Sequence, residues 1–152
     1  MPQAMQVFLY IDGDGIGHRL EGYVADNDLE AAADLSRRIG RALGDMEQTL
    51  VASGAHIIFS GGDNLLAVAE LDEFLFRRLL HQFKDSVGCS ASAGVGRTAT
   101  EAYLSLTVAK SMGGGHTVFW QEFRRESERK VAVQSSVSRQ PRPDAVKRRT
   151  ER

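Results

Sequence analysis

Residues 7–15 read Val7-Phe-Leu-Tyr-Ile11 followed by Asp12-Gly-Asp-Gly15, and this stretch decides the fold. A short apolar run without alternation has the length of a strand and indicates a central strand covered on both faces. If the extended conformation continues past the run, Asp12 and Asp14 lie on the same side, and the glycines let a ligand approach the backbone. The stretch therefore predicts a central strand that presents two carboxylates at its end.

The segments that follow alternate between helix and strand patterns. Apolar residues recur every three or four positions from Asp26 to Ser53, which predicts a long amphipathic helix capped by Asp26 or Asn27. Two short apolar strands at 56–59 and 65–69 flank the connection Ser60-Gly-Gly-Asp-Asn64, which is typical of a hairpin. The remaining predicted elements are a helix over 72–84, a strand over 87–95, a helix opened by a capping box at 98–101 and ended by Gly113-Gly-Gly115, and a strand over 116–120.

This order, βαββαβ plus a helix and a strand, predicts an α+β ferredoxin-like fold with a mainly antiparallel sheet and helices on one face. Residues 1–123 are expected to form this domain, with 9 Lys and Arg against 16 Asp and Glu. Residues 124–152 carry 10 against 4 and are predicted to be a basic tail, flexible or only locally helical. A solvated tail is the favoured interpretation, and contact with nucleic acid, an acidic partner or a neighbouring protomer stays open.

Composition excludes several classes of protein. A chain of 152 residues that is 42% hydrophobic can build one core, and Cys89, the only cysteine, allows neither an intrachain disulfide nor a cysteine zinc site. There is no apolar run of about 18 residues and no signal-peptide pattern, so we expect a soluble cytoplasmic protein without membrane insertion.

Two acidic motifs are expected to meet. In the split βαβ plan the first strand is antiparallel to the third, so Asp12 should converge with Asp63 of the hairpin connection. Converging carboxylates suit Mg²⁺, and two such ions would form a nucleotidyl-transfer site. The alternative is that both motifs are simply turns. Lys110, at the end of the last predicted helix, is placed either to reach phosphates or to complement the helix end.

These motifs, with Ala109-Lys-Ser-Met-Gly-Gly-Gly115, resemble the palm domain shared by GGDEF cyclases and the polymerase subunit of type III CRISPR systems. In size and in its GGDN variant, the chain most resembles the minimal CRISPR polymerase family, stand-alone palms of bacterial anti-phage operons. The resemblance covers about residues 5 to 123. It implies synthesis of a cyclic oligonucleotide signal from ATP, with cyclic di-AMP favoured, pyrophosphate released and a sensing effector as downstream partner.

The resemblance also implies roles for individual residues. Asp12 and Asp63 match metal-binding catalytic carboxylates for Mg²⁺ or Mn²⁺, and the Gly13 carbonyl matches a backbone ligand. Lys110 matches a lysine that contacts the triphosphate. The hairpin residues that match the segment beside the nucleotide are Ser60, Gly61, Gly62 and Asn64.

One position departs from the pattern, because Asn64 stands where GGDEF proteins carry Glu and the large CRISPR polymerases carry Asp. An amide supplies no negative charge, so Asp14 is an additional candidate metal ligand. A non-catalytic nucleotide sensor, a palm-type GTP cyclohydrolase and an unrelated interaction module stay open as alternatives. Because one small palm holds one triphosphate and ring closure joins two nucleotides, a homodimer is expected.

Overall fold

The computed structural model describes residues 5–137, which form a five-stranded sheet and five helices. The elements follow the chain in the order β1 (Gln6–Gly13), α1 (Ile16–Ala25), α2 (Leu29–Ala52), β2 (His56–Gly61), β3 (Asn64–Glu70), α3 (Glu73–Val87), β4 (Ala91–Gly96), α4 (Ala99–Ser111), β5 (Thr117–Phe119) and α5 (Trp120–Val137).

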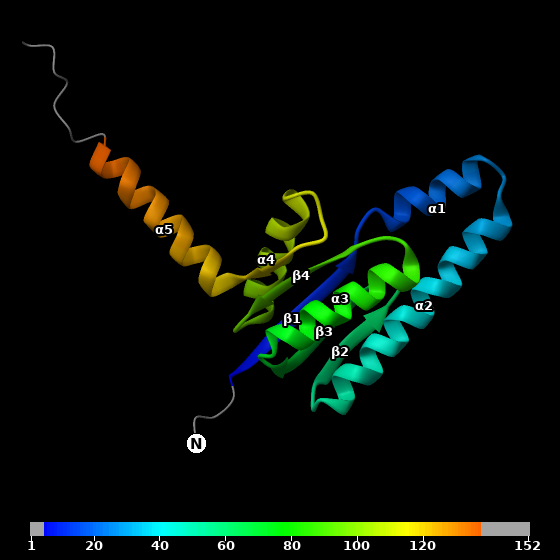
Figure 1. The fold of residues 1–152 in the computed structure, drawn as a ribbon, viewed down its shortest axis with the longest axis horizontal. Coiled ribbons are helices and arrows are strands. Elements are labelled where there is room, and N and C mark those ends of the chain that lie inside the picture. Colours follow the sequence, from blue (N-terminus) through cyan, green and yellow to red (C-terminus); the bar gives the residue numbers. More distant parts are fainter. Residues whose placement is uncertain (1–4, 138–152) are drawn as a thin grey trace, which may run out of the picture.

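The sheet has the strand order β2-β3-β1-β4-β5, with β1 at its centre (Figure 1). β1 runs antiparallel to both β3 and β4, while β5 pairs with β4 in parallel. The order β2-β3-β1-β4 is that of the ferredoxin-like split βαβ plan, and β5 extends it at one edge. The predicted α+β class and mainly antiparallel sheet are confirmed.

The helices divide between the two faces of the sheet. Helices α2 and α3 contribute the large buried side chains of the core, which pack on the face carrying Leu9, Ala67 and Ala93. Helix α4 packs on the opposite face. It lies so close to β4 that a side chain at Gly94 would collide with the α4 backbone at Ala102. The expectation of helices on one face therefore holds for α2 and α3 but is wrong for α4.

Helix α1 was not predicted. It begins after Gly15, which has a left-handed φ of 66°, and its only fully buried residue is Ile16. A turn with Asn27 at φ 56° separates α1 from α2, and the side chain of Asp28 caps α2 by accepting a hydrogen bond from the Ala31 N–H at 3.0 Å. The N-cap of α2 is therefore Asp28 and not Asp26 or Asn27 as predicted, because Asp26 and Asn27 belong to the turn between α1 and α2.

The chain after β5 is helical where the structure describes it. Helix α5 begins at Trp120 and ends at Val137, so the first part of the predicted basic tail, residues 124–137, is helical. Surface ion pairs spaced four residues apart, Arg124 with Glu128 and Lys130 with Glu126, stabilise it. The predicted tail beyond residue 137 lies outside the described residues. Across residues 5–137, every helix is too short or too polar to span a membrane.

Candidate functional site

Strand register brings the two acidic motifs together at the end of β1. Asp12 lies opposite Asn64 of β3 on one side and opposite Ser92 of β4 on the other. The Gly13 N–H donates a hydrogen bond to the Asp63 carbonyl at 2.9 Å, which fixes the hairpin to the end of β1. The predicted convergence of Asp12 and Asp63 is confirmed.

Asp14 is held by four donors. Its carboxylate accepts hydrogen bonds from the hydroxyls of Ser90 and Ser92, both at 2.8 Å, and from the Gly115 N–H at 2.6 Å. Partial burial alone would raise the pKa of Asp14, but these bonds, together with Lys110, hold that pKa below its ordinary value. Asp14 is therefore a fixed, ionised carboxylate at neutral pH.

The triple glycine after α4 wraps around this carboxylate. All three residues of Gly113-Gly-Gly115 have positive φ, between 71° and 101°, which only glycine adopts readily. A side chain at Gly114 would lie 2.7 Å from the carboxyl carbon of Asp14. The glycine run is therefore needed for the loop to approach Asp14 closely.

Lys110 in the last turn of α4 connects the carboxylates. Its Nζ lies 2.7 Å from Asp12 and 3.0 Å from Asp14, and it also donates a hydrogen bond to the Gly13 carbonyl. Burial opposes the charge, but the bonds to Asp12 and Asp14 raise the pKa of Lys110 above its ordinary value. In this structure the single positive charge of the ammonium thus offsets one of the two negative charges of the first motif.

Asp63 has the opposite electrostatic setting. Burial and the nearby negative charge of Asp12 raise the pKa of its carboxyl above the ordinary value. A side chain at Gly13 would lie 3.1 Å from the Asp63 carboxylate and collide with Ile16. Gly13 therefore lets Asp63 and α1 pack against the end of β1, where burial, and then the charge of Asp12, disfavour the ionised form of Asp63.

These groups suit a hard cation. Asp12, Asp14, Asp63 and the Gly13 carbonyl are oxygen donors, the ligand type that Mg²⁺ and Mn²⁺ prefer. In the part of the chain that the structure describes, no cluster of three or more His, Cys, Asp or Glu side chains is arranged for metal binding. The donor chemistry fits a divalent ion, and binding would require Lys110 to move off the carboxylates.

The hairpin supplies the remaining predicted site residues. Ser60 and Gly61 end β2, Gly62 turns the chain with φ 61°, and Asn64 begins β3 directly opposite Asp12. Their roles beside a nucleotide stay predictions.

Next to the hairpin lies a cavity of about 320 Å³ between α1 and α2. Asp63 lines this cavity directly. Gly40 of α2 also lines it, and a Cβ added at Gly40 would meet open space. The sequence did not predict α1, which forms one wall of this cavity. Ile16, Leu20 and Tyr23 have the spacing of an amphipathic helix, but Gly17 and Gly22 interrupt the pattern. The other lining residues are Ser36, Ile39 and Gly62.

A split βαβ sheet with carboxylates at the end of its first strand and in the neighbouring hairpin defines a palm domain. Residues 8–120 match the sequence family described as the minimal CRISPR polymerase domain, and the chain belongs to that family. No curated protein sequence matches the chain significantly.

Solved structures share the fold at low sequence identity. A Csm1-Csm4 cassette in complex with one ATP matches with a TM-score of 0.57 and 19% identity, and the cassette in complex with cA4 with 0.56 and 18%. Both matches cover 74% of this chain but 20% of the other chain, so this protein corresponds to one part of a much longer one. The active GGEEF domain of a diguanylate cyclase from Vibrio cholerae matches with a TM-score of 0.49 and 13% identity, over 76% of this chain and 82% of that domain.

Proposed function

We propose that the protein is a metal-dependent nucleotidyltransferase that makes a cyclic dinucleotide or oligonucleotide signal from ATP, with cyclic di-AMP as the favoured product and pyrophosphate released. The observation that carries the proposal is the convergence of Asp12, Asp14 and Asp63 around the end of β1. Membership of the minimal CRISPR polymerase family supports it. The signal would act in bacterial anti-phage defence through a cyclic-nucleotide-sensing effector.

Asp12, Asp63, Asp14 and the Gly13 carbonyl would hold Mg²⁺ or Mn²⁺. A bound divalent ion lowers the pKa of an attacking hydroxyl and neutralises charge on the leaving pyrophosphate. Asn64 contributes no charge, so Asp14, ionised through its hydrogen bonds, supplies the negative charge that an acidic residue there would give. Lys110 can swing on its flexible side chain from Asp12 to a triphosphate.

The cavity beside Asp63 is a suitable place for the nucleoside. Its walls are largely aliphatic, and Ser36, the hairpin backbone and Asp63 supply the polar groups, the mixture that small-molecule sites show. Ser60, Gly61 and Gly62 would then lie along the bound nucleotide, and Gly62 borders the cavity itself.

Ring closure requires two nucleotides whose hydroxyls each attack the α-phosphate of the other. Because one small palm domain would hold one triphosphate at Asp12 and Asp63, we propose that two chains face each other as a cytoplasmic homodimer.

The test incubates the purified protein with each of the four NTPs and Mg²⁺ or Mn²⁺ and identifies products by mass spectrometry. Asp63→Asn removes a charge at the site without changing size, and Asp45→Asn makes the same change at an exposed position on α2. We expect a cyclic dinucleotide and pyrophosphate from the unmodified protein and from Asp45→Asn, but none from Asp63→Asn. No product from any NTP, or equal product from both variants, would refute the proposal.

A second candidate, a non-catalytic nucleotide sensor, is favoured by one observation. Lys110 pairs with Asp12 and Asp14, and Asn64 replaces an acidic residue, so the cluster carries less negative charge than its three carboxylates suggest. A sensor predicts tight binding of a finished cyclic dinucleotide in calorimetry with no pyrophosphate formed. A ring-opened product from GTP would instead indicate a palm-type cyclohydrolase.

A further inference from the structure

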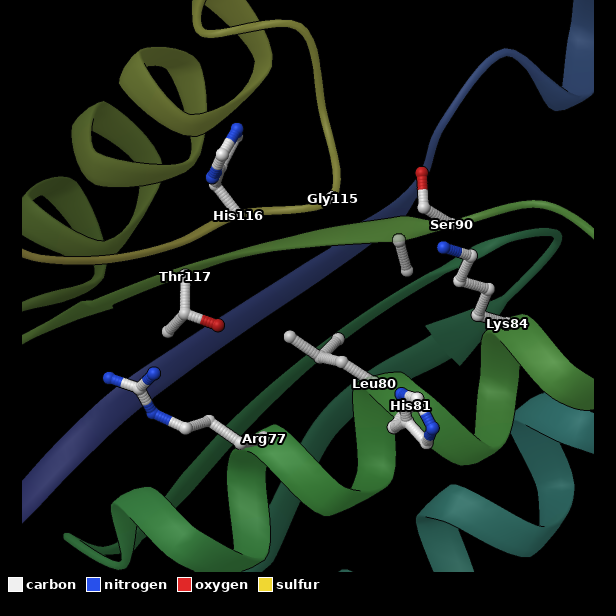
Figure 2. A pocket seen from close by; sticks show the side chains of 9 residues that line it. Arg77, Leu80, His81, Lys84, Ser90, Gly115, His116 and Thr117 are labelled. Carbon is white, nitrogen blue, oxygen red and sulfur yellow. The ribbon is translucent and has the colours of Figure 1, made fainter.

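A second cavity, of about 340 Å³, lies between α3 and the edge of the sheet formed by β4 and β5. Figure 2 shows Arg77 and Lys84 reaching from α3 toward the sheet and Thr117 pointing back toward Arg77, while the side chains of Ser90 and His116 point away from α3. This cavity shares no lining residue with the cavity beside Asp63. The remaining lining residues are Leu80, His81, Ala91 and Gly115.

The charge of this cavity contrasts with that of the domain around it. Residues 1–123 carry 9 Lys and Arg against 16 Asp and Glu, yet the cavity is lined by two of those cations, two histidines and no carboxylate. Arg77, His81 and Lys84 are spaced four and three residues apart, so the three side chains lie along one face of α3.

The acidic groups near these side chains are on α3 itself and hold them weakly. Arg77 lies 4.0 Å from Glu73, and His81 lies 3.7 Å from Asp85, both in exposed pairs. Exposed ion pairs of this kind are weak, so a ligand with several negative charges can compete for the cations.

The cavity adjoins the carboxylate cluster. Its lining residues Ser90 and Gly115 both donate hydrogen bonds to Asp14. The negative charge of Asp14 does not dominate this border, because Lys110 lies 3.0 Å from the same carboxylate.

We propose that this cavity is a binding site for a polyphosphate anion, either free pyrophosphate or the triphosphate tail of a nucleotide. The guanidinium of Arg77, the ammonium of Lys84 and the hydroxyl of Thr117 are groups that bind phosphate oxygens through charge-assisted hydrogen bonds. Leu80 and Ala91 are the apolar side chains of the lining, and neither offers a surface on which a base would stack. The site goes beyond the proposed function, since anion binding here requires neither a divalent ion nor catalysis.

The test measures binding by isothermal titration calorimetry in buffer with EDTA, so that no metal bridges the ligand to Asp12 or Asp63. The probes are sodium pyrophosphate and ATP in separate titrations, which distinguishes the free anion from a nucleotide tail. The double variant Arg77→Gln/Lys84→Gln removes both permanent charges of the cavity. Arg78→Gln is the matched control, because Arg78 is an exposed arginine of the same helix that does not line the cavity.

We expect at least one probe to bind, with affinity reduced about tenfold or more in the double variant, which removes both permanent charges of the cavity, and unchanged in Arg78→Gln. No binding of either probe, or equal affinity in the double variant and the control, would overturn the proposal. Binding that is lost in Lys110→Gln but kept in the double variant would also overturn it, by placing the anion at the carboxylate cluster. A failed cyclase assay leaves these titrations unchanged, so the two proposals fail separately.

Discussion

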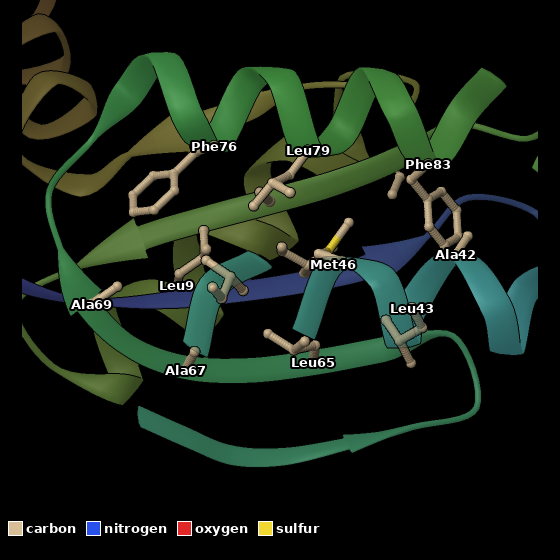
Figure 3. Packing of buried hydrophobic residues seen from close by; sticks show 14 of the residues in the cluster. Leu9, Ala42, Leu43, Met46, Leu65, Ala67, Ala69, Phe76, Leu79 and Phe83 are labelled. Carbon is tan, nitrogen blue, oxygen red and sulfur yellow. The ribbon is translucent and has the colours of Figure 1, made fainter. Parts of the chain in front are cut away.

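The two faces of the sheet are built in different ways. On one face, large side chains of α2 and α3 fill the space above β1, β3 and β4, as Figure 3 shows for Phe76, Leu79 and Phe83, which point from α3 toward the strands. On the other face, β4 presents Ser92, Gly94 and Gly96, and the backbone of α4 lies directly on the glycines.

The first face mainly stabilises the fold, and the second mainly positions side chains around Asp12 and Asp14. The first face buries most of the large apolar side chains and supplies the hydrophobic stabilisation of the fold. The second brings α4 close enough for Lys110 to reach Asp12 and Asp14, and Ser92 on that face donates to Asp14 directly. Substitutions on the two faces should therefore have different consequences.

The largest effect is expected from Gly94→Val. A Cβ at this position would lie 2.0 Å from the Ala102 carbonyl oxygen and 2.3 Å from the Leu106 nitrogen, both fixed helix backbone. We expect the free energy of unfolding in urea to fall by about 4 kcal/mol or more, with loss of the Lys110 contacts and of activity. Gly40→Ala, where a Cβ meets open space, should instead raise stability by about 0.5–1 kcal/mol. A Gly94→Val protein as stable as the original would contradict the packing of α4.

Leu9→Ala tests the core face. Leu9 is fully buried on β1, and truncation leaves a cavity, so unfolding should become easier by about 3 kcal/mol. Because the carboxylate cluster lies on other residues, product formation per folded molecule should persist below the melting temperature. Loss of activity without loss of stability would show that the two faces are not separable in this way.

Asp14 and Asp63 should respond to amide substitution with opposite signs. Asp14→Asn breaks charge-assisted hydrogen bonds and should cost about 1–2 kcal/mol at pH 7. Because the folded pKa of Asp14 is lowered from about 3.8, its contribution is complete above that value and is lost as the pH falls through the lower folded pKa. The stability difference between Asp14→Asn and the original protein, measured by urea unfolding at several pH values, should therefore shrink only in strong acid.

Asp63 has a raised folded pKa, so its ionised form is disfavoured in the folded state at neutral pH. Asp63→Asn should raise the free energy of unfolding by a few tenths to about 1 kcal/mol while activity is lost. This gain should diminish as the pH falls and the carboxyl of Asp63 becomes protonated. A destabilised Asp63→Asn protein at pH 7 would argue against an unfavourable setting, by burial and by Asp12, for the ionised carboxylate of Asp63.

The smallest change in stability is expected from Gly40→Leu, because the new side chain enters open space beside the cavity near Asp63. We expect ATP affinity in the presence of Mg²⁺ to fall about tenfold, with stability changed by less than about 1 kcal/mol. Gly44→Leu, at a second α2 glycine with open space around it that does not line the cavity, is the matched control. Equal affinity in the two variants would place the nucleoside elsewhere.

The sequence predicted the strands well because their signals are local. The apolar run 7–11, the GGDN hairpin and the helix pattern before it each mark an element by composition alone, and antiparallel pairing then required Asp12 and Asp63 to meet. The sequence did not predict helix α1, because glycines interrupt its pattern. It left a local helix in the segment of α5 as one of two alternatives, because this segment has little apolar surface to bury. The sequence also did not predict that α4 lies on the second face of the sheet, because this placement depends on Gly94 and Gly96 of β4.

The sequence by itself determined which strands form, their order along the chain and the acidic residues at their ends, since backbone propensity and turn chemistry act over a few residues. Only the tertiary structure decided how these charges are balanced. Lys110 reaches Asp12 and Asp14 from 96 to 98 residues away because Gly94 and Gly96 admit α4 to the sheet. Arg77 of α3 faces Thr117 of β5 across a cavity because packing brings together elements that are distant in the chain.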